Sequence, residues 1–157
     1  MKKILRTTLL LLILLVTAAS VYIFINYTPD KSFSEVKEKW AYENSQFLEL
    51  DGMPVHYRIN GNGKPIVLIH GTGASLHTWE EWTKILEQEF QVISLDIPGF
   101  GLTGPNKEGE YNLNYYAKFL DTFLKQIDID TIAIAGNSLG ELLLGPTLLY
   151  SQKKSKN

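Results

Sequence analysis

The residues best suited to covalent chemistry in this 157-residue chain form the run Gly136-Asn137-Ser138-Leu139-Gly140. This G-x-S-x-G pattern directly follows an apolar run at residues 131–135, so it stands where a buried strand ends and a helix is expected to begin. The pattern predicts that Ser138 occupies a strained turn with its hydroxyl exposed as a nucleophile. Gly136 and Gly140 are required because side chains at those positions would collide across so tight a turn.

Two further loops are expected beside Ser138. The run His70-Gly71-Thr72-Gly73 follows an apolar strand at residues 66–69, and the loop at residues 96–101 follows a second strand. Because sites in open α/β sheets form at the carboxyl ends of the strands, these loops should meet at one edge of the sheet. Gly71 and Gly73 leave room for a substrate, and the backbone N–H groups of Thr72 and Leu139 are candidate oxyanion-hole donors.

These loops need a sheet to position them, and the apolar pattern predicts one. The expected strands are residues 47–50, 55–59, 66–69, 92–95 and 132–135, and the expected helices are residues 78–90 and 115–127. Asp51-Gly52 between the first two strands is a hairpin signal, and the unbroken apolar run at 66–69 is typical of a sheet covered on both faces. The fold class expected is α/β, with an N-terminal hairpin followed by mostly parallel strands and flanking helices.

The N-terminus carries a separate, membrane-targeting pattern. Residues 9–25 contain no charged side chain, and a basic segment at residues 2–6 precedes them. We interpret residues 1–27 as a signal-anchor that forms one transmembrane helix, with its N-terminus in the cytoplasm and the following domain on the extracytoplasmic side of the cell membrane. The alternative is a signal peptide cleaved near Ala18, which would yield a secreted protein. Residues 28–44 are expected to form a juxtamembrane stalk or a short helix over the domain.

The composition excludes several classes of protein. The chain has no cysteine, which rules out disulfides, thiolate catalysis and cysteine-ligated zinc. Its net charge is −2 and no basic patch stands out, so nucleic acid is not an expected partner. Neither a metal nor a cofactor is expected.

In the order and spacing of these motifs, the chain resembles the α/β-hydrolase superfamily, specifically its esterase, lipase and C–C hydrolase-like branch. The matching stretches are residues 67–73, 95–101 and 135–140, and the resemblance extends from about residue 47 to residue 140. It implies a serine hydrolase that cleaves an ester or related bond of a small molecule through an acyl-enzyme. Ser138 would be the nucleophile, with Thr72 and Leu139 as oxyanion donors. A serine here speaks against the dehalogenase and epoxide-hydrolase branches, which have an aspartate at this position.

The chain departs from the family after the serine. A family member needs an acid and then a histidine in that part of the chain, whereas here Glu141 is the only acid that follows and no histidine does. We expect His56 to make a cross-strand contact, His70 to shape the oxyanion loop and His77 to face solvent. None of the three is expected to be the general base.

The segment after Gly140 is also unusual, because Glu141 replaces the second glycine of the family pattern and Pro146 interrupts the expected helix. A one-nucleotide deletion just after the Gly140 codon would explain both features. The chain then divides into a signal-anchor at 1–27, a stalk at 28–44, a partial α/β-hydrolase domain at 45–140 and an aberrant tail at 141–157. Such a chain is expected to be inactive. A non-catalytic membrane-tethered remnant or binding module is the alternative function.

Overall fold

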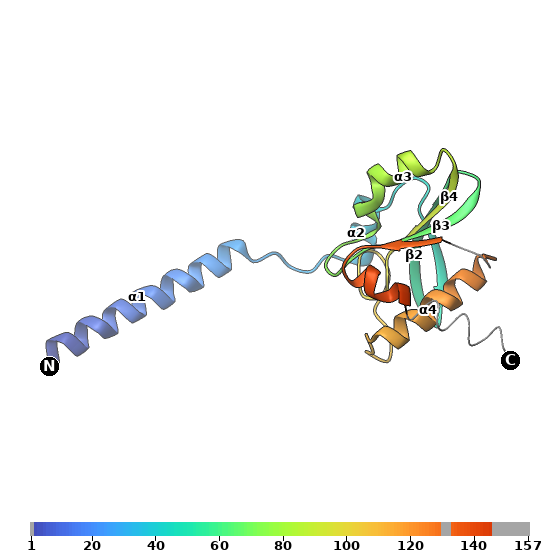
Figure 1. Cartoon of the computed structure of the whole chain (residues 1–157). Helices are drawn as coiled ribbons and strands as arrows, with labels where there is room; N and C mark the ends of the chain where they lie inside the picture. Colours follow the sequence, from blue (N-terminus) through green and yellow to red (C-terminus); the bar gives the residue numbers. More distant parts are fainter. Residues whose placement is uncertain (1, 130–132, 146–157) are drawn as a thin grey trace. The chain divides into compact units, whose positions relative to one another are not determined.

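The computed structural model describes residues 2–129 and 133–145, and the chain forms two units, residues 1–32 and 33–157. The first unit is dominated by helix α1 (Lys2–Asn26), a continuous helix of 25 residues with no buried side chain (Figure 1). At 1.5 Å per residue it is about 37 Å long, enough to cross a hydrocarbon core of about 30 Å. A single helix of this kind, close to the N-terminus, fits a membrane span or a signal sequence equally well.

The second unit is built on a five-stranded sheet with the strand order β1-β2-β4-β3-β5. The strands are β1 (Gln46–Leu50), β2 (Met53–Asn60), β3 (Lys64–Ile69), β4 (Phe90–Leu95) and β5 (Ala133–Gly136). Strands β3, β4 and β5 are parallel, and the β1–β2 hairpin joins β4 in the antiparallel sense. The predicted fold class is therefore confirmed.

The hairpin turn has the geometry that its sequence predicts. Leu50 pairs with Met53, which leaves Asp51 and Gly52 as a two-residue connection with φ angles of 51° and 75°. Both central residues have positive φ, as a type I′ turn requires, and this turn matches the right-handed twist of the two strands.

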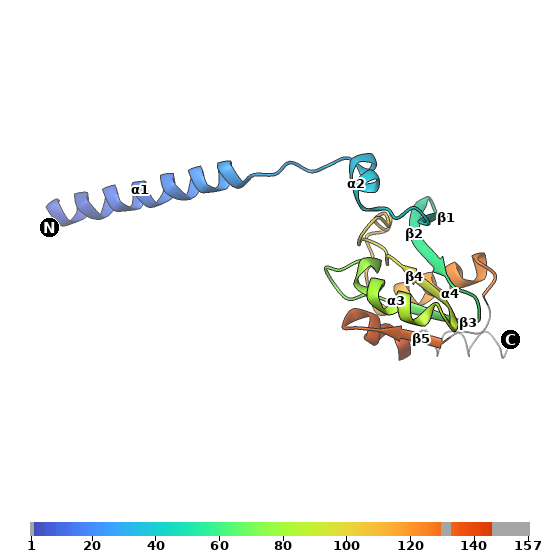
Figure 2. The same cartoon turned by 90° about the horizontal axis from the view of Figure 1, so that it is seen from above.

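Helices cover both faces of the sheet (Figures 1 and 2). The short 3-10 helix η1 (Leu76–Trp79) and helix α3 (Glu80–Leu86) lie on one face, and helix α4 (Leu113–Gln126) lies on the other. The main core joins the strands to α4 and to the helical residues 139–145; its fully or almost fully buried members include Val67, Ile69, Ile93, Leu95, Leu120, Phe123 and Leu143. Leu68 and Val92 are buried as well. The central strands β3 and β4 are apolar at most successive positions, because helices cover both faces of the sheet there.

The helix predicted at residues 78–90 is shorter than expected. Its first turn is 3-10, α3 ends at Leu86, and Phe90 belongs to β4, where it pairs with Lys64 of β3. Strand pairing thus overrides the helical spacing at the end of this segment. The helix predicted at 115–127 is confirmed as α4, which starts earlier because the Asn112 side chain caps it by accepting the Tyr115 N–H at 2.9 Å.

The segment predicted as a stalk or short helix contains helix α2 (Phe33–Trp40), which belongs to the same unit as the sheet. The Phe33 ring meets the Phe47 ring edge to face at 6.2 Å, and Lys37 Nζ lies 4.1 Å from the centre of the same ring. Aromatic and cation–π contacts of this kind hold α2 on the hairpin. The expected start of the last strand at 132, and residues 146–157 of the expected tail, lie outside the described residues.

Candidate active site

Ser138 lies at the turn between β5 and the helical residues 139–145. Its φ angle is +51°, a left-handed value that is uncommon for a residue with a side chain, and the residue is exposed. Such a conformation costs on the order of 1–3 kcal/mol and persists only where the surroundings impose it. The turn is held by backbone hydrogen bonds from the Asn137 N–H to the Ile69 oxygen at 3.3 Å and from the Gly140 N–H to the Asn137 oxygen at 2.9 Å.

The glycines around Ser138 are explained by close backbone approaches. A Cβ atom at Gly140 would collide with the carbonyl group of Ile69, and one at Gly136 would lie 2.5 Å from the carbonyl carbon of Gly140. A Cβ atom at Gly71 would lie only 3.0 Å from the Ser138 Cβ. The loop after β3 therefore abuts the serine, as expected from the two sequence motifs.

The two predicted oxyanion donors flank this point of contact. Thr72 follows Gly71 directly and is exposed, and the turn continues into Gly73, whose φ of +70° favours glycine. Within residues 2–129 and 133–145, no acceptor is bonded to the Thr72 N–H. Leu139 is the first helical residue after the turn, where an N–H group has no partner inside its own helix. Both groups therefore remain candidate donors to an external oxygen.

His70 is fully buried behind this loop and is held in one neutral form. Its Nδ1 is 2.8 Å from the Gly71 oxygen, and its Nε2 accepts the Ile97 N–H at 3.2 Å. Since Nε2 is an acceptor, the proton is on Nδ1, which donates to Gly71. Burial lowers the pKa of His70, although the Gly71 carbonyl and the Asp96 charge oppose this effect. His70 therefore fixes the shape of the loop, in keeping with the expected role.

Asp96 forms hydrogen bonds to three separate segments of the chain near the site. Its fully buried carboxylate accepts the Leu76 N–H at 2.7 Å and the Leu102 N–H at 2.8 Å. One of its oxygens also lies 2.8 Å from His56 Nδ1. The sequence predicts a turn-stabilising aspartate here, and the bond to Leu102 agrees with that. The bonds to His56 and Leu76 carry no signal in the sequence, because those residues come from distant segments.

Both ring nitrogens of the other two histidines also have hydrogen-bond partners. His56 Nε2 lies 2.7 Å from Ser45 Oγ, and the His56 ring stacks on the cross-strand residue Phe47 as expected. His77 is half-buried and not turned to solvent, so that expectation is wrong: its Nε2 donates to the Trp40 oxygen at 2.9 Å and its Nδ1 accepts from Ser75 at 3.0 Å. The return of α2 onto the sheet covers it. Both ring nitrogens of all three histidines are bonded, and none of these bonds is to Ser138.

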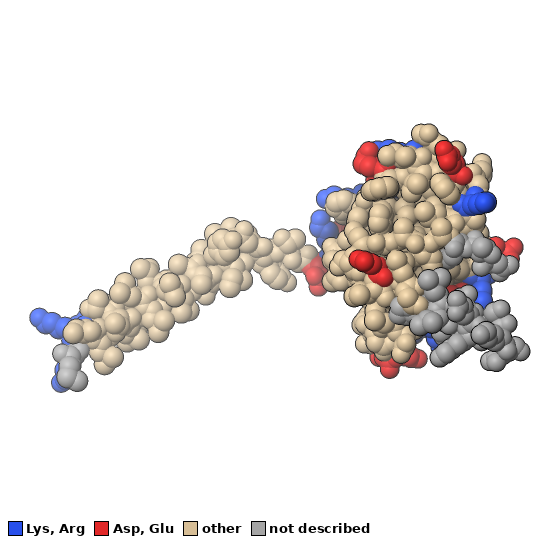
Figure 3. Space-filling model, in the orientation of Figure 1, with Lys and Arg blue, Asp and Glu red and all other residues tan. Residues whose placement is uncertain are grey.

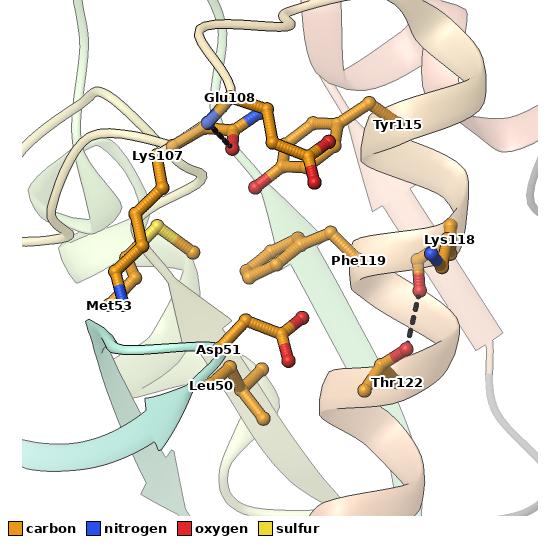
Figure 4. A pocket seen from close by; sticks show the side chains of 10 residues that line it. Leu50, Asp51, Met53, Lys107, Glu108, Tyr115, Lys118, Phe119 and Thr122 are labelled. Carbon is orange, nitrogen blue, oxygen red and sulfur yellow. Dashed lines mark hydrogen bonds between the residues drawn. The ribbon is translucent and has the colours of Figure 1, made fainter.

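A hollow among the described residues lies elsewhere. It has a volume of about 380 Å³ and lies between the β1–β2 turn and α4. Figure 4 shows Phe119 projecting from α4 into this space, with Leu50 and Asp51 of the hairpin facing it. Its lining includes neither Ser138 nor either oxyanion candidate, so it is separate from the serine site. Among the described residues no group of three acidic, histidine or cysteine side chains is arranged to hold a metal ion.

Parallel strands that lead into a serine turn, with a glycine loop against the serine, are the arrangement expected of an α/β hydrolase. The sequence pattern of the alpha/beta hydrolase fold matches residues 64–142, half of the chain. The chain belongs to this family, and the resemblance seen in its motifs is confirmed.

Relatives and solved structures agree with this assignment. The chain is 33% identical, over 112 residues, to the 2-hydroxy-6-oxo-6-(2'-aminophenyl)hexa-2,4-dienoic acid hydrolase of Metapseudomonas resinovorans, a match that covers 68% of the chain and 38% of the relative. It is 28% identical to the Cif epoxide hydrolase from Acinetobacter nosocomialis, with a TM-score of 0.66 over 80% of the chain and 44% of that structure.

A third likeness extends over most of the chain. The structure of a bacterial membrane phospholipase A, described as a virulence factor, is 25% identical with a TM-score of 0.65 and covers 90% of the chain. The chain covers 46% of that structure. It thus spans less than half the length of each of these three proteins.

Proposed function

We propose that Ser138 is the nucleophile of a serine hydrolase that cleaves an ester or related bond through an acyl-enzyme. The observation that carries the proposal is the exposed serine held at φ +51° directly against Gly71. In this proposal the serine Oγ attacks the substrate carbonyl. The N–H groups of Thr72 and Leu139 then stabilise the negative oxygen of the tetrahedral intermediate, and losing one such donor typically costs about 3 kcal/mol of barrier.

The residue type at the turn favours this chemistry over epoxide opening, despite the likeness to an epoxide hydrolase. A carboxylate that opens an epoxide forms an ester, which water can then cleave. A serine hydroxyl would form an ether, which water does not cleave under the same conditions. Attack on an acyl carbonyl leaves Ser138 as an ester that can be hydrolysed, so turnover is possible.

The described residues supply no general base to Ser138. All three histidines are bonded elsewhere, and His70 is held neutral by burial. We therefore expect the 157-residue chain by itself to turn over esters orders of magnitude more slowly than a complete triad does. A non-catalytic binding module remains the second candidate, and it is favoured because the described residues supply no general base.

An external base can test the nucleophile without a general base from the protein. The full chain in detergent is treated with p-nitrophenyl acetate, with and without imidazole, and intact mass spectrometry measures acylation. We expect an imidazole-dependent acyl adduct on Ser138 that is absent in Ser138→Ala. Ser45→Ala is the matched control, because Ser45 is the serine bonded to His56. An adduct that survives Ser138→Ala and is lost in Ser45→Ala would refute the assignment.

For residues 9–25 we propose a membrane anchor, with the domain on the extracytoplasmic side. The basic side chains gather at the N-terminal end of α1, while both signs of charge are scattered over the visible face of the second unit (Figure 3). Basic residues favour the cytoplasmic side of a span. A reporter fused after Asn157 is expected to be active outside the cytoplasm and to sediment with membranes. Release of a soluble form that lacks roughly the first 20 residues would instead show a cleaved signal peptide.

A further inference from the structure

A second cavity, of about 310 Å³, lies between α2 and the loops that follow β3 and β4. Its lining residues are Val36, Trp40, Ser75, His77, Asp96, Gly101 and Leu102. Helix α2 supplies the first two, so this helix forms one wall. The volume equals that of about ten water-sized groups at ~30 Å³ each, which is enough for an alkyl chain of medium length.

The polar side chains that line this cavity already have hydrogen-bond partners. His77 is bonded to the Ser75 hydroxyl and to the Trp40 carbonyl, and the Asp96 carboxylate is occupied by two backbone N–H groups and by His56. A polar ligand would find few vacant partners among these residues, and an anionic one would face the carboxylate. The ligand portion that fits is apolar and uncharged, packed against Val36, Trp40 and Leu102.

The cavity and Ser138 lie at the same edge of the sheet. Gly136 of β5 and Leu95 of β4 are both paired with Ile69 of β3, so the three residues are level. Neighbouring strands are about 4.8 Å apart, which puts the end of β4 roughly 10 Å from the end of β5. Asp96 directly follows Leu95, and Ser138 lies two residues after Gly136. The separation is of the order of a medium-length acyl chain.

We propose that this cavity binds the alkyl chain of the ester substrate, with α2 as its cover, and that the substrate class is therefore an acyl ester of medium or long chain. That the bound alkyl chain belongs to an ester cleaved at Ser138 rests on the proposed function. Three observations support an alkyl occupant: the apolar wall, the bonded polar groups, and Trp40, which remains 51% exposed. Helix α2 begins at Phe33, soon after the apolar helix α1 ends at Asn26, so along the sequence the proposed cover closely follows the segment proposed to meet lipid.

The binding step is tested on the full chain in phosphatidylcholine nanodiscs with a diazirine-bearing palmitic acid. Peptides that contain Val36 or Leu102 are expected to be crosslinked, and Val36→Trp, which fills the cavity, should lower their yield about tenfold. Ile85→Trp is the matched control, because Ile85 is an exposed apolar helix residue outside the lining. Equal crosslinking of these peptides in Val36→Trp and the unmodified chain would overturn the proposal.

The acylation assay separates this inference from the proposed function. With imidazole present, Val36→Trp should slow acylation of Ser138 by p-nitrophenyl octanoate but not by p-nitrophenyl acetate. If both esters acylate Ser138 at unchanged rates in Val36→Trp, the cavity does not bind the substrate's chain and the inference fails while the nucleophile stands. If neither ester acylates Ser138 but crosslinking is lost in Val36→Trp, the alkyl-chain site stands and the assignment of Ser138 fails.

Discussion

Replacing the buried Asp96 carboxylate by an amide is expected to lower the stability of the fold. Asp96→Asn keeps the shape of the side chain and replaces one acceptor oxygen by an NH₂ group. In one orientation of the amide, the Leu76 N–H faces that NH₂ group; in the other, the Leu102 N–H does. At least one buried donor is therefore left without an acceptor whichever way the amide turns.

The size of the effect follows from these bonds. An unsatisfied buried donor costs about 1–3 kcal/mol, and replacing a charged acceptor by a neutral one weakens the remaining bond by roughly 1 kcal/mol. The expected loss is about 2–4 kcal/mol, a large part of a typical stability of ~5–15 kcal/mol. With a urea dependence of about 1–3 kcal/mol per molar, the unfolding midpoint should fall by roughly 1–2 M.

The assay is urea unfolding of the full chain in detergent, followed by tryptophan fluorescence. Glu81→Gln is the control, because Glu81 forms an exposed ion pair with Lys84 and its loss should leave the midpoint almost unchanged. If Asp96→Asn shifts the midpoint no more than Glu81→Gln does, the network around the carboxylate does not stabilise the loops as argued.

Three further predictions follow from single residues. Burial lowers the pKa of His70, so below about pH 6.5 the unfolded chain binds a proton at this residue while the folded chain does not. The free energy of unfolding should therefore fall as the pH drops from 6.5. The urea midpoint should fall less steeply with pH in His70→Asn than in the unmodified chain. Gly140→Ala places a Cβ against the Ile69 carbonyl and should destabilise the fold by about 1–3 kcal/mol. Gly109→Ala is the control, because a Cβ there meets open space and costs only the strain of a positive φ. The urea midpoint of Gly140→Ala should therefore be the lower of the two. Within the part of the chain that the structure describes, the buried Trp79 Nε1 has no hydrogen-bond partner. Trp79→Phe should therefore be neutral or stabilising in the same assay, and a large loss of stability would contradict this.

Much of the site could be predicted from the sequence because its signals are local. The G-x-S-x-G run after an apolar strand locates the serine turn, since a tight turn needs glycines at fixed offsets from the serine. Apolar runs located the central strands for the same reason: a strand with both faces covered must be apolar at successive positions. The sequence pattern did not predict which group excludes a side chain at Gly140. That group is the Ile69 carbonyl, on another strand.

The failures came from contacts between distant segments. Helical spacing continued to Phe90, but that residue joins β4 because it pairs with Lys64. His77 looked like a solvent-facing residue because its partner, the Trp40 carbonyl, belongs to a helix far earlier in the chain. Neither partner is recognisable from the residue types around the contact.

The sequence by itself determined the class of fold, the position of the candidate nucleophile and the apolar N-terminal helix, because strand burial, turn geometry and helix hydropathy depend on neighbours along the chain. Only the tertiary structure decided which residues surround the nucleophile. It inserts β4 between β2 and β3, and that strand order brings His56 and Leu76 to one carboxylate at Asp96. It also packs α2 over the end of the sheet, which creates an apolar cavity from side chains that no local pattern groups together.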